Sequence, residues 1–328
     1  MNQSKLAAVT DGQLPFRGLP IGDLRGFGRV RADAALACLA IDREAGTLRA
    51  SHDERDLISL HLDGDVDWQQ AYVPGTNVLE TTGHLDGAEL RVADFMPLAE
   101  GRSGQAIAKG RFVRIVTCTE GHVAFRLVCA AGIDGRPANT ARTTQGWHVA
   151  CSHPMGVGAD VAATMVTLTE GESLVLVISN DAVEGGPALL ADALHGLGDT
   201  IHYWSWWSDR CRYRGDDAEA RLREALSIKL SCGDHGMLVE EPGERAFAPA
   251  PLSDVARAAA LFLDLGYRME CAQLLAQVDA ASQCDAFGRR PSEGVHLDTL
   301  GRYLARYGRA GLPVSITLPD DEPLRAAR

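Results

Sequence analysis

Few side chains in this sequence have both the type and the spacing that metal binding requires. Asp63, Asp65 and Asp67 alternate within a polar stretch, as do the first oxygen ligands of a helix–loop–helix calcium site. Such a site also needs Gly at its sixth position and Glu at its twelfth, where this chain has Trp68 and Pro74. We therefore interpret the three aspartates as a solvated acidic turn.

Two short clusters combine histidine with cysteine, the residue types that bind zinc or form a nucleophile–base pair. One cluster holds His148, Cys151 and His153, and the other holds Cys232 and His235. A closed zinc site needs four ligands in tetrahedral reach, and strand alternation would separate His148 from Cys151. Cys151 and His153 could share a strand face as nucleophile and base, although no third group nearby would orient the base. We predict no metal site and no cofactor.

The densest aromatic cluster lies between residues 203 and 207. At helical spacing Tyr203, Trp206 and Trp207 share one face, and Trp204 lies elsewhere. Such a face either packs against another part of the fold or offers rings on which a sugar can stack. Tyr203, Trp206 and Trp207 are therefore candidate substrate-binding residues, with packing as the alternative interpretation.

Composition excludes several classes of partner. The 328 residues carry a formal net charge of −12, which argues against binding to nucleic acid or to an anionic membrane. No apolar run is long enough to span a bilayer, and the first residues lack the apolar segment of a secretory signal. The eight cysteines form no Cys-x-x-Cys pair, which favours reduced core thiols. We expect a cytoplasmic protein.

The hydrophobic pattern predicts strands first and helices later, which makes the chain α+β. Short alternating stretches separated by turn residues continue to residue 179 and are typical of an antiparallel β-sandwich. Asn77–Thr82 and Glu89–Phe95 illustrate them, as a hairpin around Asp86-Gly87. The period then changes to three and four residues. It predicts helices over 187–196, 197–210, 216–232, 253–265, 267–283 and 296–307.

One of these helices has clear end signals. Ser253 is the expected N-cap of the helix over 253–265, and Gly266 is the expected residue that ends it.

Three stretches of the sandwich region resemble the N-terminal part of glycoside hydrolase family 15, the bacterial glucoamylases and trehalases. Ile21–Arg25 (IGDLR) is similar to the family's IGD-L/N-R, and Tyr72–Thr81 (YVPGTNVLET) is similar to its Y-x-P-x-TNVLET. Val92–Pro97 (VADFMP) is similar to its V-x-DFMP, and the order and spacing also match. The resemblance implies an N-terminal β-sandwich (a supersandwich), a helical linker and then helices of an α/α barrel.

The resemblance also implies a domain organisation, and it implies that the family's catalytic carboxylates are absent from this chain. We expect a β-sandwich domain over 1–195, a helical linker over 196–250 and a short remnant of the α/α barrel over 251–328. Family 15 members are inverting glycosidases whose acid and base are two carboxylates in that barrel. The helices that would carry both carboxylates are missing from this chain, so its catalytic residues, if it has any, are unknown.

One sugar-binding position of the family has a counterpart here. The family's Y-x-W-x-R-D stretch resembles Ala250–Asp254, where Ser253 replaces the arginine and Asp254 matches the aspartate. The resemblance implies that Asp254 binds substrate. The alternative is that Asp254 only places negative charge in the first turn of its helix.

Three functional hypotheses follow. The first is a non-hydrolytic relative of the family that binds a carbohydrate or another small molecule. The second is a repurposed biosynthetic enzyme with a pocket between the sandwich and the remaining helices. The third is a glucosidase- or trehalase-type hydrolase completed by a partner chain, so whether the chain is an enzyme stays open. In each case an incomplete helical layer exposes apolar faces, which predicts a homo-oligomer.

Overall fold

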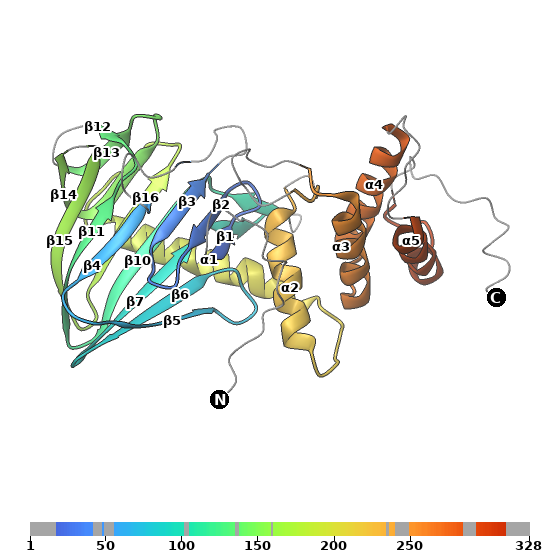
Figure 1. The fold of residues 1–328 in the computed structure, drawn as a ribbon, viewed down its shortest axis with the longest axis horizontal. Coiled ribbons are helices and arrows are strands. Elements are labelled where there is room, and N and C mark those ends of the chain that lie inside the picture. The colour runs from blue at the N-terminus through green and yellow to red at the C-terminus, as the bar shows by residue number, and fades with distance from the viewer. Residues whose placement is uncertain are drawn as a thin grey trace.

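The computed structural model has a β-rich end and a helical end (Figure 1). The N-terminal part is a large, curled antiparallel sheet and the C-terminal part is helical, which confirms an α+β fold. No helix among the described residues is long and apolar enough to cross a membrane. The structure describes residues 18–41, 48, 56–101, 105–134, 138–158, 160–233, 236–239, 249–284 and 293–312.

The sheet folds over on itself into two facing layers. The first layer runs in the order β1 (Leu19–Gly22), β2 (Phe27–Val30), β3 (Leu36–Ala40), β4 (Ile58–Leu62), β11 (His122–Cys129) and β15 (Val161–Thr169). The second runs β5 (Asp67–Tyr72), β6 (Leu79–Leu85), β7 (Ala88–Phe95), β10 (Arg111–Glu120), β16 (Ser173–Ser179) and β14 (His148–Gly158), with β13 (Ala138–Thr143) and β12 (Ile133–Asp134) beyond β14. A separate hairpin joins β8 (Leu98–Glu100) to β9 (Ala106–Ala108).

Strand β14 connects the two layers. Its first half pairs with β16 over His148–Cys151, and its last residues, Gly156–Gly158, pair with β15. A strand that changes sheets in this way makes the corner of a sandwich.

The predicted hairpin forms β6 and β7, and the period-two pattern of β7 decides what each side chain meets. Leu90 and Val92 face the core between the layers, whereas Ala93 and Phe95 face outward into a second apolar cluster. That outer cluster is covered by α1 (Leu189–Asp209), so β7 is buried on both faces.

The helices are α1, α2 (Ala218–Ser231), α3 (Leu252–Leu265), α4 (Arg268–Cys284) and α5 (Glu293–Tyr307). Helices expected over 187–196 and 197–210 are one continuous helix, α1, because its packing along the sheet offsets the weak helix propensity of its two glycines. Ser253 is not the N-cap of α3, since Pro251 takes that position and Ser253 lies inside the helix. Gly266 ends α3 in the left-handed region at φ 91°, as predicted.

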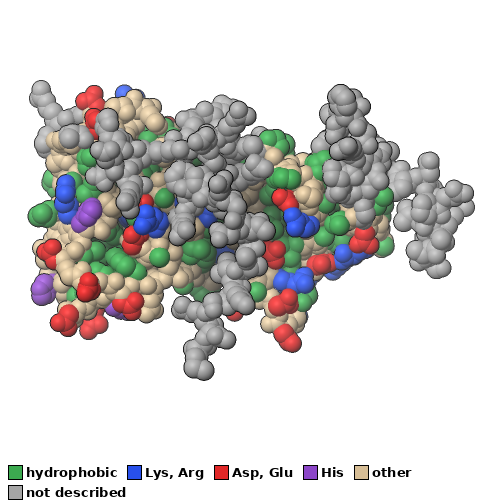
Figure 2. All heavy atoms as spheres, viewed as in Figure 1, with side chains coloured by type: hydrophobic (Ala, Val, Ile, Leu, Met, Phe, Trp, Pro, Cys, Tyr) green, Lys and Arg blue, Asp and Glu red, His purple; other side chains and the backbone are tan. Residues whose placement is uncertain are grey.

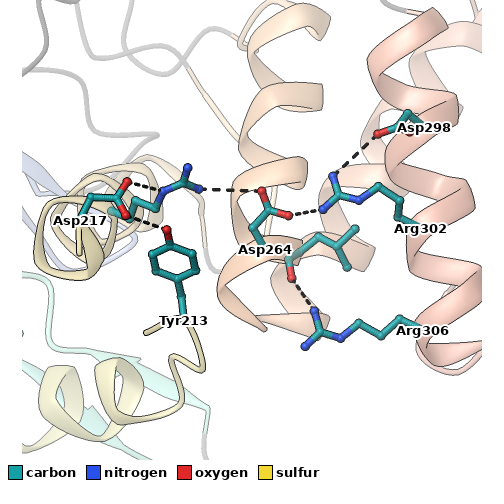
Figure 3. A network of polar contacts seen from close by, with 8 residues as sticks. Tyr213, Asp217, Asp264, Asp298, Arg302 and Arg306 are labelled. Atoms are coloured by element: carbon teal, nitrogen blue, oxygen red, sulfur yellow. Dashed lines mark hydrogen bonds and ion pairs between the residues drawn. The ribbon is translucent and has the colours of Figure 1, made fainter. Parts of the chain in front are cut away.

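A chain of alternating charges ties the helices together at the surface (Figure 3). Arg221 of α2 contacts Asp217 at 2.9 Å and Asp264 of α3 at 3.9 Å. Asp264 also binds Arg302 of α5, which contacts Asp298 at 3.8 Å. Figure 2 shows basic and acidic side chains intermingled over this helical end. Exposed pairs of this kind contribute little singly, but a network fixes the relative positions of α2, α3 and α5.

Candidate functional site

The stretches that resemble family 15 meet where the sandwich joins the helices. Met96 packs directly over Gly26, in the turn after β1, and leaves no room there for a Cβ atom. Gly22, at the end of β1, lies against Leu230 of α2. Leu24 belongs to the apolar cluster of the helices although it lies between two strands. The β1–β2 turn therefore links the two halves of the fold.

Asp23 organises this turn from a fully buried position. Its Oδ1 accepts hydrogen bonds from the backbone N–H groups of Arg25 at 3.1 Å and Gly26 at 2.6 Å. Its Oδ2 has no hydrogen-bond partner among the described residues. Burial raises the pKa of Asp23 to about 6, against the lowering effect of the nearby backbone N–H groups. The turn also holds Leu24 at φ 71°, a left-handed conformation that is costly for a branched side chain.

A hollow of about 250 Å³ lies beside this carboxyl group. Its wall consists of Asp23, Leu24 and Arg25 from the turn and of the three residues of β9. Apart from Asp23 and Arg25, the side chains of the wall are apolar. Ile107 of β9 is 42% exposed, so this side of the wall is open to solvent. Hollows of roughly 300–1,000 Å³ hold drug-sized ligands, so this one suits a molecule the size of a single sugar ring.

The second resembling stretch docks onto α2 rather than lining the hollow. Arg223 of α2 donates to the carbonyl oxygen of Thr76 at 2.6 Å and to the side-chain oxygen of Asn77. Its guanidinium lies 3.9 Å from the ring centroid of Tyr72, and Asn77 donates in turn to the carbonyl oxygen of Leu226 at 3.1 Å. These contacts are those of a structural joint, and they hold α2 against the hairpin.

The third resembling stretch contributes a buried ion pair to the sandwich core. Asp94 of β7 accepts two hydrogen bonds from Arg114 of β10, at 2.7 and 2.8 Å, and both side chains are fully buried. The bidentate geometry compensates the charge of each group.

Glu270 of α4 is the centre of the helical half. Its Oε1 accepts from Trp207 Nε1 at 2.8 Å and from Arg210 at 3.1 Å, and Lys229 lies 3.6 Å away. Burial alone would raise the pKa of Glu270, but Lys229 and Arg210 outweigh it and hold that pKa below its usual value. One carboxylate therefore joins α1, α2 and α4.

The aromatic residues predicted to bind sugar lie around this carboxylate. Trp207 is 1% exposed and stacks on Tyr267 with a centroid distance of 4.1 Å, and Tyr203 is 3% exposed. Neither ring offers a face to a ligand, so packing accounts for both. Trp206 is only partly buried, but Arg210 covers its ring at 4.5 Å.

Asp254 lies away from the tryptophans. It forms an ion pair with Arg257, one turn further along α3, and its side chain is 43% exposed. Phe262, which contacts Trp207, is eight residues later in the same helix, or about 12 Å along its axis. The structure therefore does not bring Asp254 and the aromatic cluster into one site.

The cysteine and histidine clusters do not form a reactive centre. Cys151 is fully buried, and burial raises its pKa to about 11, so the thiol stays protonated at neutral pH. The hypothesis that Cys151 and His153 act as nucleophile and base is wrong, because the thiol is closed in the core and His153 contacts Ser152 at 3.0 Å. His235 lies outside the described residues. Within the described residues, no three metal-binding side chains gather.

A second, smaller hollow of about 130 Å³ lies between α1 and the start of β10. Four polar side chains of its wall contact one another in pairs. Arg111 lies 2.9 Å from Asp192, and His195 lies 3.6 Å from Asp199. The hollow beside Asp23 is different because Oδ2 of Asp23, a buried acceptor, has no hydrogen-bond partner in the part of the chain that the structure describes.

Neither a known protein family nor a curated protein matches the chain. The resemblance to family 15 therefore rests on the three short stretches alone. The sequence reasoning did not single out Asp23, Arg223 or Glu270 as functional or joining residues. Asp23 could have been noticed, because it stands inside the resembling stretch Ile21–Arg25.

Proposed function

We propose that this chain is a relative of glycoside hydrolase family 15 that binds a carbohydrate, or a similar small polar molecule, without hydrolysing it. The ligand occupies the hollow beside Asp23. In this proposal the curled sheet corresponds to the family's supersandwich, and α3, α4 and α5 correspond to helices of its α/α barrel.

The observation that carries the proposal is the unpartnered Oδ2 of Asp23. A buried polar atom without a hydrogen bond costs stability, and a bound ligand that supplies the missing partner is one explanation of such an atom. A ligand hydroxyl or amino group would supply the missing donor. The carboxyl group is closed to solvent in this structure, so the proposal requires the wall of the hollow to open before a ligand can reach it.

The hollow supports binding better than hydrolysis. Inverting hydrolysis of a glycoside needs two carboxylates on opposite sides of the scissile bond. Asp23 is the one acidic side chain among the described residues of the wall. Binding through a single carboxylate needs no second acid.

The proposal is tested by measuring thermal stability with glucose, trehalose, maltose and glucose 6-phosphate, together with a glucose-release assay. A ligand at one hundred times its Kd adds about 2.7 kcal/mol to the free energy of unfolding. We expect a stabilising shift in the wild-type chain, its loss in Asp23→Asn, and no glucose release.

The matched control is Asp192→Asn, which removes an exposed carboxylate elsewhere and should keep the shift. Glucose release would contradict the non-hydrolytic proposal. A shift that persists in Asp23→Asn would place the ligand elsewhere. No shift with any sugar would remove the support for carbohydrate binding.

A further inference from the structure

Four acidic side chains among the described residues are buried, and two of them pair with an arginine or a lysine. Asp94 binds Arg114 in a bidentate pair, and Glu270 binds Arg210 and Lys229. Asp279 acts electrostatically on His296 of α5, whose pKa burial lowers below its usual value. The fourth is Asp23.

Asp23 makes no ion pair within 4 Å among the described residues, although it is as deeply buried as Asp94. The charge of Arg25 acts on Asp23, but its effect is weaker than that of the surrounding backbone N–H groups. A buried carboxylate without a cation is costly, and a cation supplied from outside the fold would remove that cost.

We propose that the ligand of the hollow carries an ammonium group, which takes the place beside Asp23 that arginine or lysine takes beside Asp94 and Glu270. This inference rests on the proposed function, because it names the chemical class of the ligand for the same hollow. The ligand class is a small primary amine, such as an amino sugar.

The wall of the hollow fits this class better than it fits a neutral polyol. A neutral sugar presents several hydroxyl groups, each of which needs a partner when it is buried. The described wall offers one carboxylate, one guanidinium and four apolar side chains. A molecule with one charged donor and a less polar body leaves fewer groups unsatisfied.

The test compares ligands that differ at one position of the same ring. Binding of glucosamine, glucose and N-acetylglucosamine to the wild-type chain is measured by titration calorimetry at pH 7.5. Glucosamine carries the ammonium group, glucose has a hydroxyl there, and acetylation removes the charge. We expect glucosamine to bind at least ten-fold more tightly than the other two.

Two variants locate the preference. Asp23→Asn keeps a similar shape but removes the negative charge, and it should reduce the preference for glucosamine to less than two-fold. Asp192→Asn removes an exposed carboxylate at the other hollow and should leave the preference unchanged. Near-ultraviolet circular dichroism establishes that both variants are folded.

The outcomes separate this inference from the proposed function. Equal affinity for glucosamine and glucose would overturn the ammonium inference and leave carbohydrate binding standing. Absence of binding by all three would overturn both. A preference that survives in Asp23→Asn would also overturn the inference, because the charge would then be recognised elsewhere.

Discussion

The indole nitrogen of Trp207 donates a 2.8 Å hydrogen bond to Oε1 of Glu270, which lies 63 residues later in the chain. The bond runs from α1, which lies on the sandwich, to α4, which belongs to the helical layer. Arg210 and Lys229 contact the same carboxylate. The sandwich and the helices are therefore connected through a charged centre as well as through apolar packing.

Glu270→Gln should weaken this connection. The amide keeps an acceptor for Trp207, but it leaves Lys229 and Arg210 without a negative partner. Removal of one member of a buried pair costs roughly 3–5 kcal/mol, and because Arg210 is 39% exposed we expect about 2–3 kcal/mol. Urea unfolding measures the loss.

Trp207→Phe is the comparison for Glu270→Gln. It removes the hydrogen bond to Glu270 and part of the ring that stacks on Tyr267, while the ion pairs remain. A change in stability no larger than that of Trp207→Phe, about 1 kcal/mol for the hydrogen bond, would show that the charges contribute nothing measurable.

Asp23→Asn should stabilise the protein, and the gain should depend on pH. The pKa of Asp23 is raised from 3.8 to about 6 in the folded state, so the free energy of unfolding falls as pH rises between these values. The asparagine variant lacks this loss. The free energy of unfolding of the variant should exceed that of the wild type by an amount on the order of 3 kcal/mol at pH 7.5, and by little at pH 4.

Urea unfolding of both proteins at pH 4, 5.5 and 7.5 measures the difference. A variant less stable than the wild type at pH 7.5 would show that the ionised carboxylate is already well compensated. That result would also remove the observation on which the binding proposal rests.

Gly26→Ala should be strongly destabilising for steric reasons. An added Cβ would collide with Met96 and would lie 2.7 Å from the carbonyl oxygen of Ala40 and 2.9 Å from that of Ile41. Backbone atoms cannot move aside cheaply, so we expect a loss of roughly 3 kcal/mol or more. The midpoint of thermal unfolding records it.

Gly198→Ala is the control for Gly26→Ala, because it makes the same substitution at a position with space for a Cβ atom. It lies inside α1, and an added Cβ would meet nothing within 4 Å. Alanine should stabilise the helix by about 0.5–1 kcal/mol. Equal effects of the two substitutions would contradict the packing described for the β1–β2 turn.

Arg114→Leu should be more harmful than the double replacement Asp94→Leu/Arg114→Leu. The single change leaves a fully buried carboxylate without its cation, at a cost of about 3–5 kcal/mol. The double change removes both charges and should recover part of that loss. A double-mutant cycle in urea gives the coupling energy, and additive losses would mean that the pair is not coupled.

Much of the fold follows from local patterns. The period of two in Glu89–Phe95 places Leu90 and Val92 in the core, and the Asp86-Gly87 turn needs no distant contact. Gly266 ends α3 because glycine adopts the left-handed conformation without strain. Two local predictions were wrong. Pro251, not Ser253, is the N-cap of α3, and packing on the sheet keeps α1 continuous through its glycines.

Local sequence patterns were enough to predict strands before helices, the two separate faces of the strand over Glu89–Phe95, and the resemblance carried by three short stretches. The three-dimensional fold was needed to show that Tyr203 and Trp207 are buried, that Glu270 joins three helices, and that Oδ2 of Asp23 has no hydrogen-bond partner among the described residues. The physical reason is one of range. Strand and helix periods depend on neighbours a few residues apart, whereas the partner of a buried charge comes from a distant segment that only folding brings near.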